Sequence, residues 1–108
     1  MIELTKSQKK KVRQLIEKGL MRDYSDAIRT VRNVCHSYVD GESDPKQHYL
    51  KLYSALASKD KDIARRYDNL TGSRYLPTLI MLLREEVLSK GDLQKLDDDL
   101  RQYLLSIL

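Results

Sequence analysis

The sequence offers three soft metal ligands, the single cysteine Cys35 and the histidines His36 and His48. Zinc sites draw on recurring spacings such as Cys-x-x-Cys or His-x-x-x-His, and neither occurs in this chain. Cys35 and His36 are consecutive in a stretch of helical periodicity, so their side chains should point about 100° apart. We therefore expect a buried structural cysteine, two surface histidines, and neither a metal nor any other cofactor.

Patterns for other kinds of catalysis are also missing from the sequence. No serine stands in a Gly-x-Ser-x-Gly turn, and no set of cysteine, histidine and acid has a recognisable spacing. The adjacent acids Glu85–Glu86 and Asp97–Asp99 fall on expected helix surfaces, whereas acid–base catalysis needs carboxylates across a cleft with separated pKa values. We expect a protein that is not an enzyme, with no catalytic residue and no small-molecule substrate.

Basic residues gather in the first third of the chain. Residues 1–39 carry nine lysines and arginines against four acids, a net charge of +5, while residues 40–108 carry 11 bases against 12 acids. Such a segment can attract phosphate or an acidic partner, although a solvated helix face is the commoner role. Nucleic acid is therefore an alternative partner. Its candidate contacts are Lys6, Lys10, Arg13, Ser25, Arg29 and Arg32.

Seven tyrosines take the place of all phenylalanine and tryptophan. A tyrosine can bury its ring while its hydroxyl keeps a polar partner, which suits the border of a core or a contact surface. Tyr67 and Tyr75 lie close in sequence to Arg65, Arg66 and Arg74, and clusters of aromatic and arginine side chains can bind single-stranded nucleic acid. For most of the seven we expect packing at the edge of the core.

Apolar residues recur at helical spacing almost throughout, which predicts an all-α fold. We expect one domain over residues 1–108, a compact bundle of five or six short helices, with a short strand over Ile2–Thr5 as an option. The basic part forms a helix pair over residues 5–39. Its first helix is capped by Thr5 or Ser7 and ends near Gly19, and its second begins after Ser25. The stripe that the second helix should bury is Tyr24, Ala27, Ile28, Val31, Val34, Cys35 and Tyr38.

The nearly neutral part, residues 44–108, should form the rest of the bundle. Asp44 and Pro45 suit the N-cap and first position of a helix. Residues 79–83 are apolar on all sides of a helix, so they should lie at the centre. The inward positions expected on the helix after Pro45 are Tyr49, Leu52, Tyr53 and Leu56, and a separate short helix should follow from Ser58 or Asp60. Leu105 and Leu108 widen the apolar stripe of the last helix, which suggests burial against a second copy.

The motifs of residues 2–35 resemble the ribbon-helix-helix module of bacterial repressors and antitoxins. The resemblance consists of Leu4-Thr5, the apolar positions Val12, Leu15 and Ile16, then Gly19, then Ser25-Asp26-Ala27-Ile28-Arg29. It implies a dimer whose paired strands enter the major groove, with Glu3 and Thr5 facing the bases and Ser25 at a phosphate. Residues 40–108 resemble no family.

The longest apolar run has five residues, 79–83, and the first six residues do not read as a signal peptide, so we expect a cytoplasmic protein without a membrane partner. The function predicted is that of a non-enzymatic helical interaction module that self-associates, for instance as a homodimer. The alternative is a nucleic-acid-binding regulator of ribbon-helix-helix type.

Overall fold

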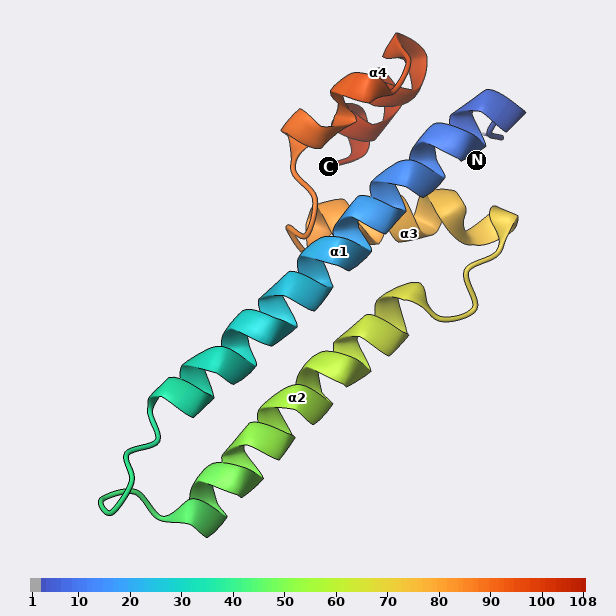
Figure 1. Cartoon of the computed structure of the whole chain (residues 1–108). Coiled ribbons are helices and arrows are strands. Elements are labelled where there is room, and N and C mark those ends of the chain that lie inside the picture. Colours follow the sequence, from blue (N-terminus) through green and yellow to red (C-terminus); the bar gives the residue numbers. More distant parts are fainter. Residues whose placement is uncertain (1–2) are drawn as a thin grey trace.

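The computed structural model describes residues 3–108 and confirms the all-α fold (Figure 1). The elements are α1 (Lys6–His36), α2 (Pro45–Tyr67), the 3-10 helix η1 (Gly72–Arg74), α3 (Tyr75–Arg84), the 3-10 helix η2 (Lys90–Lys95) and α4 (Asp98–Ile107). Residues 3–108 contain no strand, so the optional strand does not form over residues 3–5. Its first residue, Ile2, lies outside the described residues. None of the helices in this part of the chain has the length and apolar character needed to cross a bilayer.

The N-terminal helix pair is in fact one helix of 31 residues. Thr5 is its N-cap, as expected, and forms a reciprocal pair of hydrogen bonds with Gln8, at 3.1 Å and 2.8 Å. The helix then passes through Gly19 and Ser25 without a break. A Cβ atom on Gly19 would stand 3.1 Å from both Leu82 Cδ1 and Tyr67 Oη. Gly19 therefore lets α3 and the end of α2 approach α1 closely, and it does not end the helix.

The region after Asp44 likewise forms one helix where two were expected. Asp44 caps α2 by accepting a hydrogen bond from the Lys46 backbone N–H at 3.0 Å, and Pro45 occupies the first turn as predicted. Ser58 and Asp60, the expected caps of a separate helix, lie inside α2. α2 runs antiparallel to the second half of α1, and we call α2 together with residues 20–36 of α1 the hairpin (Figure 1).

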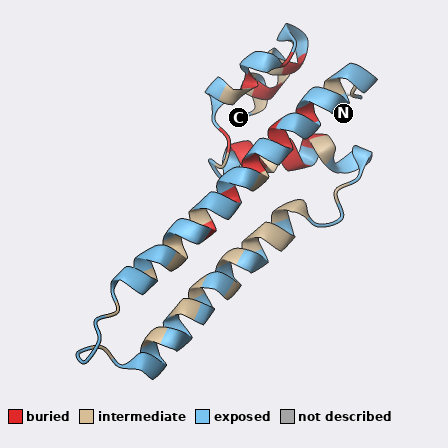
Figure 2. Cartoon of the chain, viewed as in Figure 1, coloured by how far each residue is buried: buried red, intermediate tan, exposed pale blue. Residues whose placement is uncertain are grey.

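The hydrophobic core lies at one end of the molecule, which we call the head (Figure 2). There the first half of α1 packs against α3, η2 and α4. α3 is the central element, as predicted, with Pro77 in its first turn. It ends at Arg84, because the chain turns at Glu86 (φ 62°) and returns Leu88 to the core. The buried core residues are Val12, Leu15, Ile16, Leu76, Leu79, Leu82, Leu83, Leu88, Leu93, Leu96, Leu100 and Leu104.

The molecule is elongated, so the expectation of a compact bundle is wrong. Its radius of gyration is 17.9 Å and its extents are 59 × 26 × 20 Å, whereas a compact domain of this length has a radius of gyration of about 13 Å. The excess length is the hairpin, which extends beyond the head. α2 contains no fully buried residue.

Asp92 ties η2 to α1. Its carboxylate accepts two hydrogen bonds from Arg22, at 2.7 Å and 3.0 Å, and lies 2.9 Å from Lys18 Nζ. The backbone N–H of Ser89 donates to the same carboxylate at 2.8 Å. The Arg22 guanidinium, followed by the Ser89 and Lys18 donors, holds the pKa of Asp92 well below its usual range against the opposing effect of desolvation.

Replacing Gly19 by alanine should destabilise the protein, although alanine is favoured over glycine in helices by about 1 kcal/mol. Leu82 is fully buried and the Tyr67 hydroxyl is fixed by a hydrogen bond to Asp23, so neither can make room for the methyl group. We expect a net loss of about 1 kcal/mol in the free energy of unfolding, measured by urea denaturation. A stabilised Gly19→Ala protein would show that the contact relaxes freely.

Replacing Asp92 by asparagine should cost about 2 kcal/mol of stability at pH 7, because Arg22 and Lys18 lose a charged acceptor. A pKa that is lower in the folded protein than in the unfolded chain stabilises the fold fully above the unfolded value, about 4, and loses that effect as the pH falls. The stability gap between wild type and variant should therefore close between pH 5 and pH 3 or below. A gap of constant size over that range would contradict the assignment.

Candidate functional site

The hairpin exposes the apolar stripes that were expected to be buried. The exposed fractions are 45% for Tyr24, 69% for Ile28, 66% for Tyr49, 65% for Tyr53 and 52% for Leu56. Of the stripe on α1, only Ala27 is buried. Figure 2 shows the same contrast, with red confined to the head and to the part of α1 near it. The predicted burial of these stripes is therefore wrong for the single chain.

These side chains line two hollows that follow one another along the hairpin. Tyr24, Ile28 and Leu56 line the first, of about 530 Å³, and Cys35, Tyr49 and Leu52 line the second, of about 280 Å³. From the first hollow to the second, the residue numbers of the lining positions increase on α1 and decrease on α2, as expected for antiparallel helices. We call this side the apolar face, and along α1 it extends for about 17 Å from Tyr24 to Cys35. Its residues are Tyr24, Ile28, Val31, Cys35, Tyr49, Leu52, Leu56 and Ile63, which line the hollows, and Tyr53, which lines neither hollow but is exposed on α2 about 60° around the helix from Leu56.

Cys35 and the two histidines do not form a metal site. Cys35 is exposed on the apolar face, so its expected burial is wrong. His36 is exposed at the end of α1, whereas His48 Nε2 lies 3.1 Å from Ser37 Oγ and its ring packs edge-on against Tyr38. Within residues 3–108, no group of three or more histidines, cysteines or acids is placed to hold a metal ion.

The opposite side of the hairpin is charged and faces the head. Asp26 accepts from Lys59 Nζ at 2.6 Å and lies 4.0 Å from Arg29. A polar hollow of about 300 Å³ lies here, between the two helices and the chain after α3, and Glu85 and Arg22 are among the residues that line it. The hairpin is thus amphipathic, with charges on the side of the head and apolar groups on the free side.

A buried polar junction fastens the hairpin to the head. Asp23 is buried and accepts hydrogen bonds of 2.6 Å from both the Tyr67 hydroxyl and Arg66 Nη1. Glu85 accepts from Arg65 at 2.9 Å and 3.2 Å, and from Arg66 at 3.3 Å. Burial, together with the Asp23 carboxylate, raises the pKa of Tyr67, and Arg65 lowers the pKa of Glu85.

These contacts give Arg65, Arg66 and Tyr67 a role in holding the fold together. Tyr67, Tyr75 and Tyr103 pack at the edge of the core. Tyr24, Tyr49 and Tyr53 are exposed, so the expectation that most of the seven tyrosines pack at the core edge is wrong. The junction was missed by sequence reasoning because its partners are 19 to 44 residues apart in the sequence. One signal was present, since Asp23 stands four residues from both Gly19 and Ala27 and so shares their buried side of α1.

The candidate nucleic-acid contacts fall into two separate groups on α1. At 100° per residue, Lys6, Lys10 and Arg13 share one side, and the later three residues lie about 100° around the helix. About 18 Å of helix separates Arg13 from Ser25. All six are exposed, with Arg13 3.6 Å from Glu17 and Arg29 4.0 Å from Asp26. The second group is Ser25, Arg29 and Arg32.

The unbroken helix also removes the geometry that the ribbon-helix-helix resemblance implied. Ser25 lies in the middle of α1 and begins no second helix, so it presents no free backbone N–H groups to a phosphate. Residues 3–5 form no strand, so Glu3 and Thr5 are not placed on a ribbon in the described chain.

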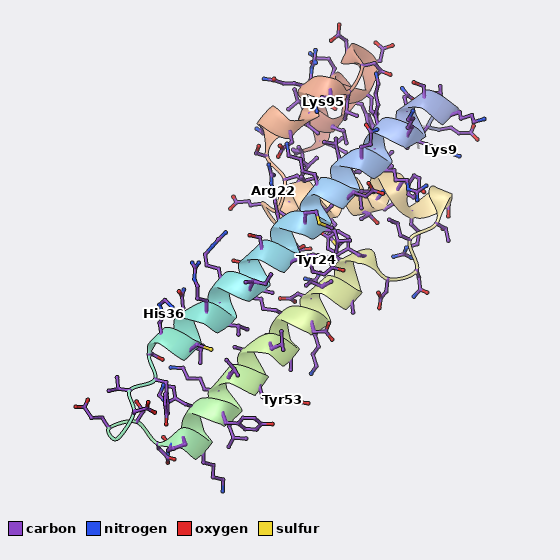
Figure 3. The ribbon with its side chains drawn as sticks, in the orientation of Figure 1. Lys9, Arg22, Tyr24, His36, Tyr53 and Lys95 are labelled. Atoms are coloured by element: carbon purple, nitrogen blue, oxygen red, sulfur yellow. The ribbon has the colours of Figure 1, made fainter. Side chains whose placement is uncertain are left out.

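No protein-family model, curated protein or solved structure matches the chain. The apolar face is the part of the described surface with the clearest chemistry. Figure 3 labels two of its exposed tyrosines, Tyr24 on α1 and Tyr53 on α2. An exposed apolar surface of this kind suits the apolar side chains of another protein surface.

The Tyr67 hydroxyl should contribute measurably to stability because it is a donor to a buried carboxylate. Tyr67→Phe leaves Asp23 with one donor fewer, and we expect a loss of about 1–2 kcal/mol in the free energy of unfolding by urea denaturation. Tyr49→Phe is the matched control, because the Tyr49 ring is exposed and the same change there should be neutral. Equal effects of the two substitutions would contradict the role given to the junction.

Proposed function

We propose that this protein is a non-enzymatic interaction module that self-associates through the apolar face of its hairpin. The observation that carries the proposal is the exposure of Tyr24, Ile28, Tyr49, Tyr53 and Leu56 along one side of two helices. Together these five expose roughly 600 Å² in one copy, using about 200 Å² for a whole side chain of this size. The largest apolar patch of a typical monomer is about 300–600 Å² and often functional.

The composition of the face supports a protein partner. Tyrosine is enriched in protein interfaces because its ring gives apolar contact while its hydroxyl tolerates water in the free state. Asp60 is the one acidic residue that lines the two hollows. The scarcity of acidic residues in these hollows resembles the centres of protein interfaces, from which charged residues are depleted.

The nucleic-acid-binding alternative has weaker support. Its candidate residues are divided between two sides of α1, and the helix break that the resemblance requires does not occur. A salt titration with random-sequence duplex separates the two proposals, because phosphate contacts give a steep loss of affinity with rising salt. Binding of that kind would favour the alternative.

A pair of leucine substitutions tests the proposed face. Leu56 lies on the apolar face, whereas Leu50 is equally exposed on α2, 53% against 52%, but points about 120° away. Light scattering of the wild type should show the mass doubling as concentration rises. We expect Leu56→Glu to weaken self-association about 100-fold and Leu50→Glu to leave it nearly unchanged.

Both variants should keep the helical circular dichroism of the wild type, because neither leucine is buried in the single chain. A wild type that stays monomeric at millimolar concentration would overturn the proposal. Equal weakening by the two substitutions would show that association uses a different surface.

A further inference from the structure

Charge is distributed unevenly along α1 and the loop that follows it. The first turns of α1 carry five bases and no acid, and the loop of residues 37–44 carries three acids and no base. All eight are exposed, and within residues 3–108 only Arg13 among them forms an ion pair, with the exposed Glu17. We call the first set the basic segment and the second the acidic loop. The basic segment is Lys6, Lys9, Lys10, Lys11 and Arg13, and the acidic loop carries Asp40, Glu42 and Asp44.

The basic segment continues the apolar face along the same side of α1. Eighteen residues make five full helical turns. Lys10 is 18 residues from Ile28, and Arg13 is 18 residues from Val31, so each pair lies on one line along the helix. The head contacts α1 from a different direction, through residues such as Leu15 and Gly19. This side of α1 is therefore free along its length of about 46 Å. It is apolar at one end, and at the other it carries Lys6, Lys10 and Arg13 together with one acid, Glu17, which pairs with Arg13.

A second copy could cover this side of α1 with its own α1 either antiparallel or parallel, and the distribution of charge favours the antiparallel arrangement. Ile28 lies at the middle of the apolar stretch from Leu20 to Cys35. If two α1 helices pair antiparallel with Ile28 at the centre, the last helical residue, His36, lies opposite Leu20 of the other copy. Arg13 is about 10 Å further along that helix, a distance that the eight residues of the acidic loop can span. A parallel arrangement would instead bring two basic segments together and two acidic loops together, which like charges oppose.

We infer that two copies pair antiparallel through the free side of α1, with the acidic loop of each copy against the basic segment of the other. The inference rests on the proposed self-association and specifies its geometry. A stable interface buries about 800 Å² per partner. The roughly 600 Å² of large apolar groups reaches that size only when surface beyond the hairpin is added, and the basic segment with the acidic loop supplies it. A two-fold pair makes this charge contact twice, once with the acidic loop of each copy.

Charge reversal tests this geometry. One variant carries Asp40→Lys and Glu42→Lys, a second carries Lys10→Glu and Arg13→Glu, and a third carries all four substitutions. Asp44 is left unchanged because it caps α2. We expect each two-substitution variant to self-associate at least tenfold more weakly than the wild type in low salt. The four-substitution variant should recover to within about threefold, and the two weak variants should form a heterodimer when mixed.

A fourth variant controls for net charge. It combines the two loop substitutions, Asp40→Lys and Glu42→Lys, with Lys51→Glu and Lys61→Glu, which restores the wild-type net charge. Lys51 and Lys61 lie on α2 away from the apolar face. This variant should self-associate as weakly as the variant that carries only Asp40→Lys and Glu42→Lys. Circular dichroism of each variant verifies that the helices are intact.

The outcomes separate this inference from the proposed function. Equal recovery in the third and fourth variants, or no recovery in either, would overturn the antiparallel pairing while Leu56→Glu still prevents self-association. A monomeric wild type, or a Leu56→Glu variant that associates normally, would overturn the proposed function itself.

Discussion

Two helices packed side by side can cover only one side of each other, and the rest of this structure follows from that constraint. In the head, a third and a fourth helix complete the burial of α1, and the leucines there are almost fully enclosed. In the hairpin no further element is present in the described chain, so an apolar stripe on each helix stays exposed. Burial of apolar surface is the dominant favourable contribution to folding and association. The hairpin therefore has the surface of half a helical bundle.

The hairpin is held in place by close packing at small residues and by hydrogen bonds and ion pairs. These contacts do not involve the large apolar residues of the apolar face, which stay exposed. At its base, Gly19 allows close approach of Leu82 and the Tyr67 hydroxyl. Next to it, Asp23 joins α1 to the end of α2 through a buried network. Further along, small Ala27 and the Asp26–Lys59 pair lie between or beside the helices. The apolar residues are thus held on a fixed frame and are not needed to form it, which is how a binding surface is usually built.

Much of the fold could be predicted from the sequence where a local rule decides it. Thr5, Asp44 and Pro45 have the side chains that begin helices, and they do so here. The apolar run at residues 79–83 correctly indicates the central helix. The rule that failed was local too. Glycine often ends a helix, but Gly19 is placed by contacts with residues 48 and more positions away, which a local pattern does not contain.

The candidate site was only half predictable for a related reason. Helical periodicity correctly placed Tyr24, Ile28 and Cys35 on one apolar side, and the spacing of Tyr49, Tyr53 and Leu56 did the same for α2. Helical periodicity identifies the apolar side of a helix, but it does not show whether another part of the same chain covers that side. From residue types alone we therefore expected burial within one copy. In the self-association that we propose, an interface between copies provides that burial instead.

The most direct measurement uses the fact that Cys35 is the only cysteine and lies exposed on the apolar face. Its rate of alkylation can be followed by mass spectrometry while the protein concentration is raised through the range where the mass doubles. Covering of the apolar face by a second copy predicts that the rate falls in step with the fraction of associated protein. An alkylation rate that is independent of concentration would contradict it.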